Sequence, residues 1–187
     1  MDALVAAFVA ALLLGIGDRT AWLAAILSSR FDRQGAVLLG AAVALAGANA
    51  LAAGAGALSA PMLTPNAKAL MLAIGCLLAG FGALFATKRP DPLVSWRGAA
   101  FTATVGLFIL AFGEADQIVT AALAARSPLP WLAAVGGTLG GLVALAPAIA
   151  LGEDAWRKLP LRIPRLIIGV GFLVFGLVTG ISALRLI

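Results

Sequence analysis

The chain contains no histidine and only one cysteine, Cys76, among its 187 residues. Without histidine the protein has neither an imidazole metal site nor a histidine proton relay. A single cysteine excludes a disulfide framework and a cluster of thiolate ligands. Charged residues are also scarce, at 11% of the chain, whereas a soluble domain has about 25%. So few polar residues cannot cover a water-facing surface, and the composition therefore excludes a soluble globular protein.

Apolar residues make up 63% of the chain, and the mean hydropathy is +1.09. We therefore expect an all-α polytopic membrane protein with a single membrane domain over residues 1–187. Each predicted transmembrane segment has roughly the 20 residues needed to cross about 30 Å of hydrocarbon. Pro147 lies inside the fifth segment and predicts a kink there. The six predicted segments are 3–28, 35–58, 67–87, 98–125, 129–151 and 166–186.

Lysine and arginine are distributed unevenly over the connections between these segments. Connections one, three and five carry nine of them, whereas the opposite side carries Lys68, Arg126 and Arg185. The positive-inside rule predicts that the nine lie in the cytoplasm and that both termini lie outside. We expect the cell inner (plasma) membrane, and we read the net charge of +5 as a topology signal rather than as a nucleic-acid surface. The nine residues are Arg30, Arg33, Lys88, Arg89, Arg97, Arg157, Lys158, Arg162 and Arg165.

Two acidic clusters interrupt the apolar sequence, at residues 14–20 and 110–117. An ionisable side chain inside a membrane costs roughly 2.5–3.5 kcal/mol on insertion scales. A protein that keeps charged groups at this depth is expected to use them. The residues concerned are Asp18, Arg19, Glu114 and Asp116.

The two clusters fall into register in an internal repeat with an offset of 96 residues, which aligns Asp18 with Glu114. The same offset aligns Gly75 with Gly171 and Gly80 with Gly176. Three spans in each half make an odd number, so the second half must enter the membrane upside down. The sequence therefore predicts two inverted three-helix repeats, 1–90 and 97–187, with a substrate site where they meet. Chance similarity is the alternative, because alanine, leucine and glycine are abundant here.

The clusters supply carboxylate, hydroxyl and amide oxygens, which are the ligands that hard divalent cations prefer. Asp18 and Thr20 would point about 200° apart on a regular helix. Their convergence requires an irregular first helix, which Gly15 and Gly17 would permit. The predicted metal ligands are Asp18, Glu114, Asp116, Thr20 and Gln117.

Charge balance gives these residues a transport chemistry. Three carboxylates together with Arg19 leave a formal charge of −2, which one divalent cation neutralises. Without the metal, burial and mutual repulsion favour proton uptake by the carboxylates. Competition between a divalent cation and protons for one site is the basis of an antiporter. We expect Arg19 to act as an electrostatic modulator that pairs with Asp116 or Glu114 in the empty site. The alternative is a buried salt-bridge network that fixes the helix register.

At these residues the sequence resembles the transmembrane protein 165 / GDT family of small cation–proton exchangers. The family carries Glu-x-Gly-Asp-(Lys/Arg)-(Ser/Thr) once in each inverted half. Residues 17–20, Gly-Asp-Arg-Thr, look like the first copy, and residues 112–114, Phe-Gly-Glu, followed by Gln117, look like the second. The chain departs from the pattern at both motif glutamates, where Gly15 and Ala111 stand. In the second copy Glu114 replaces the aspartate, Ala115 the basic residue and Asp116 the hydroxyl residue.

The resemblance implies exchange of Mn²⁺ or Ca²⁺ for protons across a membrane. The expected partners are the lipid bilayer, the divalent cation and protons, with a homodimer left open and no nucleic acid. We expect no resident cofactor, because the ion is the substrate. The chain lacks a phosphate-binding glycine loop and a catalytic constellation, so we do not expect an ATPase or another enzyme. Two alternatives are a diverged, non-transporting partner of an intact paralogue and a transporter of a different small cation.

Overall fold

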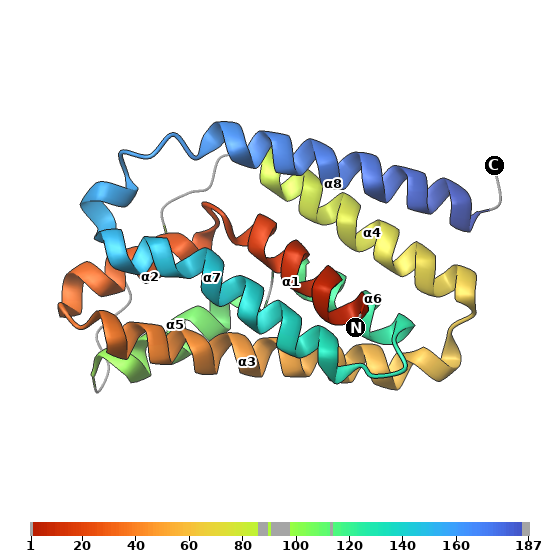
Figure 1. Cartoon of the computed structure of the whole chain (residues 1–187), viewed down its shortest axis with the longest axis horizontal. Helices are drawn as coiled ribbons and strands as arrows, with labels where there is room; N and C mark the ends of the chain where they lie inside the picture. Colours follow the sequence, from red (N-terminus) through yellow and green to blue (C-terminus); the bar gives the residue numbers. More distant parts are fainter. Residues whose placement is uncertain (1, 86–89, 91–97, 113, 185–187) are drawn as a thin grey trace.

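The computed structural model describes residues 2–85, 90, 98–112 and 114–184, and these residues form eight α-helices and one short 3₁₀ turn (Figure 1). Of the basic residues used above to predict topology, Lys88, Arg89, Arg97 and Arg185 lie outside the described residues. The elements are α1 (Asp2–Gly15), α2 (Arg19–Phe31), α3 (Gln34–Ser59), η1 (Ala60–Met62), α4 (Pro65–Leu84), α5 (Ala99–Ala111), α6 (Ala115–Arg126), α7 (Trp131–Trp156) and α8 (Arg162–Ala183).

Four helical segments in the described residues are long and apolar enough to cross a membrane on their own. They are α3 with η1, α4, α7 and α8, and they match the predicted second, third, fifth and sixth segments. The predicted first and fourth segments are instead bent pairs: α1 and α2 meet at 66°, and α5 and α6 meet at 73°. The chain thus has between four candidate spans and six, the larger number if each bent pair is one span. The first break was expected from its glycines, whereas the second was not.

Helix α7 contains Pro147, where a kink stays a prediction, and it also has an interruption that was not predicted. The non-helical backbone inside α7 lies at Gly152, where φ is +70° and ψ is −179°. A backbone with this φ favours glycine, which has no Cβ to clash. The Ser29 hydroxyl of α2 accepts a hydrogen bond from the Glu153 N–H at 2.8 Å. The Ser28 hydroxyl donates to the Ile149 carbonyl at 2.6 Å. The end of α2 therefore holds the interrupted part of α7.

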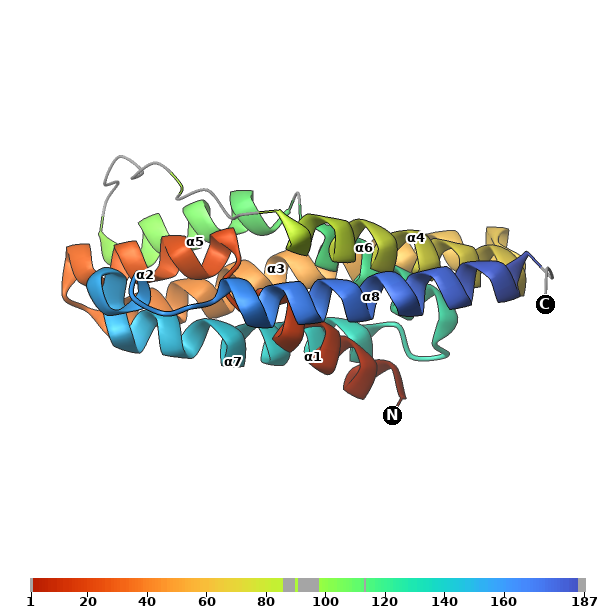
Figure 2. The same cartoon turned by 90° about the horizontal axis from the view of Figure 1, so that it is seen from above.

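Each bent pair packs against the long helix of the other half of the chain. Helices α1 and α2 lie against α7, and α5 and α6 lie against α3. The long helices α3 and α7 contact each other, and α4 and α8 pack together, with α4 also packing against α6. Figures 1 and 2 show α4 and α8 running side by side along one flank of this arrangement. The two acidic breaks are consequently enclosed by helices from both halves.

Glycines let several of these helices approach one another at backbone distance, as small residues do in membrane proteins. A methyl group added at Gly136 or Gly140 of α7 would overlap the carbonyl groups of Leu4 and Phe8 in α1. At Gly40 of α3 a methyl group would lie 2.6 Å from the Ala100 carbonyl oxygen of α5. Gly136 and Gly140 therefore allow α1 and α7 to pack at backbone distance.

Contacts between α4 and α8 recur at the sequence offset of 96. A methyl group added at Gly80 would lie 2.8 Å from the backbone nitrogen of Leu173. One added at Gly176 would lie 3.0 Å from the backbone nitrogen of Leu77. Gly80 and Gly176 are 96 positions apart, and so are Leu77 and Leu173. The two helices therefore make the same contact twice.

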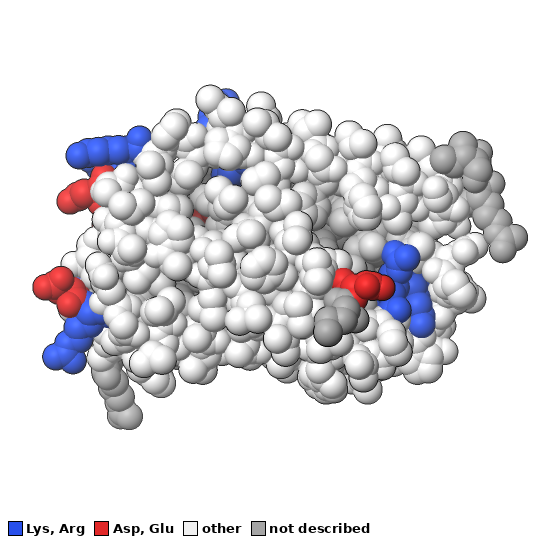
Figure 3. All heavy atoms as spheres, in the orientation of Figure 1, with Lys and Arg blue, Asp and Glu red and all other residues white. Residues whose placement is uncertain are grey.

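The outer surface is apolar around the middle of the molecule. Figure 3 shows charged side chains at the two ends and an uncharged band between them on the visible face. Large hydrophobic side chains point outward, including Leu39 on α3 and Ile167 and Phe175 on α8. On a soluble protein such a band would be a very large exposed patch, whereas a bilayer would cover it.

Close packing of α1 on α7 makes a prediction for stability. We expect Gly140→Ala to lower the free energy of unfolding in detergent by about 1–3 kcal/mol, because overpacking forces the backbones apart. Gly54→Ala on α3 is the matched control, since among the described residues outside its own helix backbone no atom lies within 4 Å of a methyl group added at Gly54. It should be neutral or stabilise by up to about 1 kcal/mol through helix propensity. Equal stability of the two variants, measured by denaturant unfolding, would contradict this account.

Candidate functional site

The two breaks place an acidic residue at the start of a helix in each half. Asp18 is the N-cap of α2 and Glu114 is the N-cap of α6, and both have extended backbone conformations. Gly17, with φ +70°, lets the chain turn between α1 and α2. The Asp18 carbonyl accepts from the Trp22 N–H at 3.1 Å, and the Glu114 carbonyl accepts from the Gln117 N–H at 3.2 Å. Asp18 and Glu114, which the offset of 96 aligns, therefore have the same local backbone structure.

A helix N-terminus favours a negative charge, because the unpaired N–H groups and the helix dipole are positive there. Neither Asp18 nor Glu114 forms a side-chain hydrogen bond to its own helix within the described residues. Their carboxylate oxygens are thus left to face outward from the helix ends. The breaks stabilise two carboxylates and present them to the space between the halves.

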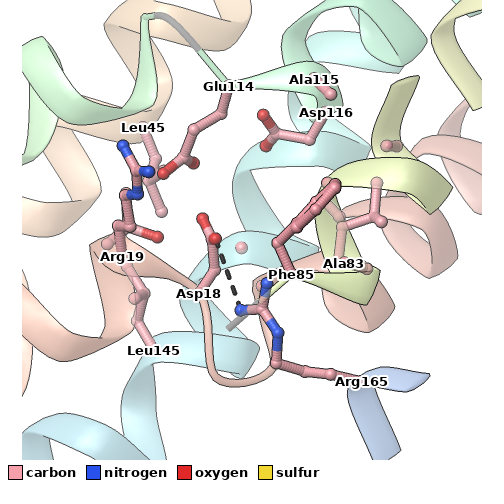
Figure 4. A pocket seen from close by; sticks show the side chains of 17 residues that line it. Asp18, Arg19, Leu45, Ala83, Phe85, Glu114, Ala115, Asp116, Leu145 and Arg165 are labelled. Atoms are coloured by element: carbon pink, nitrogen blue, oxygen red, sulfur yellow. Dashed lines mark ion pairs between the residues drawn. The ribbon is translucent and has the colours of Figure 1, made fainter. Parts of the chain in front are cut away.

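That space is a cavity of about 240 Å³, and its walls come from both halves of the chain. Figure 4 shows the carboxyl groups of Asp18 and Glu114 pointing toward each other, with Asp116 beside them. Five residues predicted for the site line this cavity: Asp18, Arg19, Thr20, Glu114 and Asp116. The breaks bring them together from positions that a pair of continuous helices would keep apart.

Gln117, the remaining predicted ligand, does not line this cavity among the residues described. Its side-chain Nε2 donates to Asp116 Oδ2 at 3.5 Å. Gln117 is buried, and its contribution in this structure is this hydrogen bond to the Asp116 carboxylate.

Several buried oxygens in the site lack a hydrogen-bond partner among the described residues. They include Glu114 Oε1 and Asp116 Oδ1. A buried carboxylate oxygen without a donor is costly, and a cation supplies what is missing. In the described part of the chain, acidic residues and Cys76 do not form a group of three or more that is compact enough to hold a metal ion. The site thus presents acceptors around a cavity, and a cation would have to draw them together.

Arg165 belongs to the site although the sequence analysis assigned it only to a cytoplasmic loop. It lies in the first turn of α8 and lines the same cavity. Its Nη1 lies 3.6 Å from Asp18 Oδ1 and also donates to the Gly17 carbonyl oxygen (Figure 4). No motif marks it, since the residue at the equivalent position of the first half is Ala69.

Figure 4 shows Arg19 beside Glu114, one of its two expected partners, and an ion pair between them stays a prediction. A second guanidinium, which was not expected, enters the site, because Arg165 forms an ion pair with Asp18. With Arg165 included, three carboxylates face two guanidinium groups, and the formal charge is −1 instead of the −2 predicted from Arg19 alone. The physical reason is that the start of α8 reaches the break in the first half, which no local pattern reveals.

The two positions where the motif glutamates would stand are closely packed. A Cβ atom at Gly15 would lie 2.7 Å from the Cβ atom of Ala144 on α7, and Ala111 is fully buried. Small residues at both positions allow α1 and α5 to pack where a longer side chain would not fit without rearrangement. The carboxylates of this site accordingly come from the helix starts.

Fold and site together define a class: a helical membrane protein with an acidic cavity where two bent helix pairs meet. The model of the family described as "Divalent cation/proton antiporter GDT1" matches residues 3–91 and 99–186. The chain therefore belongs to this family of cation transporters, as the motif resemblance predicted. It is a multi-pass membrane protein.

One curated relative comes from Vibrio cholerae serotype O1 (strain ATCC 39541 / Classical Ogawa 395 / O395) and is described as "Putative manganese exporter". It is 29% identical over 167 residues, which are 88% of this chain and 83% of the relative. No solved structure matches the chain.

Packing at Gly15 predicts a compensating pair. We expect Gly15→Ala to lower the free energy of unfolding in detergent by about 1–3 kcal/mol, because its methyl group collides with Ala144. Adding Ala144→Gly should recover at least half of that loss, since the Ala144 Cβ is the atom of another described helix that lies within 4 Å of the added group. A double-mutant cycle of chemical unfolding measures the coupling. Additive effects of the two changes would contradict direct contact between them.

Proposed function

We propose that this chain is a six-span secondary transporter that exchanges a divalent cation for protons, with Asp18 and Glu114 as its central ligands. The observation that supports this most directly is the pair of unpartnered oxygens, Glu114 Oε1 and Asp116 Oδ1, in the cavity that Asp18 also lines. Thr20 adds a hydroxyl oxygen from the same cavity wall, and Gln117 supports Asp116 from behind.

The ligand chemistry favours Mn²⁺ or Ca²⁺, because the site offers oxygen donors without sulfur or imidazole. Mn²⁺ is the first candidate, since the Vibrio cholerae relative is described as a manganese exporter. Both ions accept carboxylate and hydroxyl oxygens, so their relative transport rates must be measured.

Coupling follows from charge balance in the cavity. A bound divalent cation neutralises carboxylates that face one another across a cavity of about 240 Å³. When the cation leaves, the uncompensated negative charges repel, and protons from the other side of the membrane restore neutrality. The helix N-termini at Asp18 and Glu114 keep these groups able to ionise again. The site therefore alternates between a cation and protons.

We further propose that the two halves, 1–90 and 97–187, are inverted repeats that cross the inner membrane six times. The reciprocal contacts of Gly80 with Leu173 and of Gly176 with Leu77 support this relation. Connections α2–α3 and α7–α8 carry basic residues and lie at the same end of the molecule in Figure 1. Their cytoplasmic placement follows the positive-inside rule and puts both termini outside.

Reconstitution into liposomes that contain a pH-sensitive dye tests the function. We expect the wild-type protein to take up Mn²⁺ and to make the lumen more alkaline as protons leave. Asp18→Asn and Glu114→Gln should each lower the flux at least tenfold, which corresponds to about 1.4 kcal/mol or more, because each removes a charged ligand. Asp154→Asn is the matched control, since Asp154 is exposed near the end of α7 and does not line the cavity.

Equal flux in all four proteins would contradict the assignment of the site, and flux without a change in lumen pH would contradict proton exchange. Flux of another cation but not of Mn²⁺ or Ca²⁺ would indicate a different substrate. If the wild type is inactive and Gly15→Glu/Ala111→Glu is active, the chain is a non-transporting partner. Ala144→Gly should be included in that variant, because it makes room at Gly15.

A further inference from the structure

We propose that Arg165 is a tethered cation. Its guanidinium pairs with the Asp18 carboxylate when the transported ion is absent, and this ion pair must break before a divalent cation binds. This inference rests on the proposed function and adds a specificity-determining residue to it. Arg165 stands outside both motif copies, and its role follows from its place between α8 and the break in the first half.

The contacts of Arg165 tie α8 to the most irregular part of the site. Its guanidinium lies 3.6 Å from Asp18 and donates to the Gly17 carbonyl oxygen at the same break. The Arg165 side chain is only 13% exposed, and that of Asp18 is 24% exposed. A guanidinium is a permanent charge with several fixed donors, so at this depth it is a strong competitor for a carboxylate that would also bind a metal.

Arg165 also stands between two cavities. A second cavity of about 270 Å³ lies between α2, the end of α4 and the α7–α8 connection, and it is lined by Trp22, Leu161 and Arg162 among others. Arg165 lines both this cavity and the acidic one. Ala83 and Phe85 line both cavities as well, so these two residues and the Arg165 guanidinium form the boundary that a cation moving from the second cavity to Asp18 would cross.

Charge balance gives the direction of the effect. With both arginines in place the acidic cavity has a formal charge of −1, and a divalent cation would leave it at +1. If Arg165 withdraws, the charge is −2 and a divalent cation makes the site neutral. Binding of the cation and contact between Arg165 and Asp18 thus exclude each other. Removal of the arginine should tighten cation binding and slow cation release.

Three variants test this role: Arg165→Gln, the conservative Arg165→Lys, and Lys158→Gln as a charge-matched control in the same connection. Lys158 is exposed and does not line either cavity. Mn²⁺ binding is measured by calorimetry on the detergent-solubilised protein, and KM and kcat for Mn²⁺ are measured in liposomes. Thermal unfolding without metal reports on folding.

We expect Arg165→Gln to bind Mn²⁺ about tenfold more tightly, with KM and kcat both lowered, because the ion no longer displaces a competitor and leaves more slowly. Arg165→Lys should restore values near those of the wild type, and Lys158→Gln should not change them. Unchanged Kd and KM in a folded, transporting Arg165→Gln protein would overturn the role of Arg165. A wild-type protein that neither binds nor moves Mn²⁺ or Ca²⁺ would instead overturn the proposed function.

A separate observation concerns α4 and α8. Gly75 of α4 packs on α6, where an added methyl group would lie 3.3 Å from side-chain carbons of Ile118 and Val119. Its equivalent on α8, Gly171, is exposed and has no atom within 4 Å of an added methyl group. The equivalent of Ile118 is Trp22 on α2, which lines the open second cavity. In the described residues α4 packs along α6, whereas α8 does not pack along α2.

We infer that α8 closes onto α2 through Gly171 and Trp22 in the opposite-facing state, while α4 separates from α6. In transporters built from inverted repeats, alternating access is largely a rocking or gating of one repeat against the other. If the two halves proposed here trade conformations in this movement, a contact made by one half predicts the missing contact of the other. This closure would fill the second cavity and block the path past Arg165. Like the preceding inference, it rests on the proposed transport function.

Gly171→Leu tests the closure, because the added side chain has open space in this structure but would block the approach to Trp22. We expect normal folding and Mn²⁺ binding with at least tenfold lower flux. Gly54→Leu, at a position that also has open space, should keep normal flux. If Gly171→Leu transports Mn²⁺ as fast as the wild type, the inferred closure of α8 onto α2 is overturned. If the wild-type protein itself transports no divalent cation, the proposed function is overturned.

Thiol cross-linking provides the second measurement, in a Cys76→Ala background. Trp22→Cys with Gly171→Cys should be joined by a short bifunctional reagent during Mn²⁺ turnover, and the product should be inactive. Trp22→Cys with Val178→Cys is the control pair, since Val178 lies about 10 Å further along α8. Cross-linking of the control alone, or of neither pair, would overturn the closure.

Discussion

Two helices that stop halfway through the molecule set the conditions for the rest of this structure. Each break exposes backbone N–H groups that lipid cannot satisfy, so the breaks must lie inside protein, and the long helices α3 and α7 surround them. A carboxylate at each new helix start meets the positive end of the helix dipole. Backbone interruption, enclosure and buried negative charge are therefore one arrangement. Without the carboxylate the positive helix start would be uncompensated, and without the enclosing helices the free N–H groups would face lipid.

Enclosure on this scale depends on helices that approach closely. The buried hydrophobic residues are mostly alanine, and glycines on α7 meet the backbone of α1 directly. In a bilayer, helix association gains little from the hydrophobic effect and relies on packing. The same need for close packing explains why the small residues Gly15 and Ala111 stand at the two positions of the motif glutamates. Small residues at these two positions keep the half-helices tightly seated, and the acidic groups of the site project from the next turn of chain instead.

Much of this arrangement can be predicted from the sequence, because lipid exposure and buried charge leave strong patterns. The apolar segments, the pairing of Asp18 with Glu114 and the irregular first helix all follow from composition and spacing. The second break was not predicted, although Gly113 aligns with Gly17 at the offset of 96, because a single glycine inside an apolar segment is also compatible with a continuous membrane helix. Arg165 looked like a topology signal, because a chain pattern does not reveal how far a loop residue reaches inward. Gln117 has the right chemistry, but the helical angle of α6 after the break turns it behind Asp116.

The attachment of α2 to α7 has a mechanical consequence. The hydroxyls of Ser28 and Ser29 hold the α7 backbone on both sides of Gly152, so the far end of α2 is clamped to a helix of the other half. Its near end begins at Asp18. Because a short helix moves as a rigid body, the attachment at its C-terminal end also fixes the position of the Asp18 carboxylate relative to α7. Bending at Gly152 would therefore shift Asp18, which lies ten residues before Ser28 at the opposite end of the same short helix.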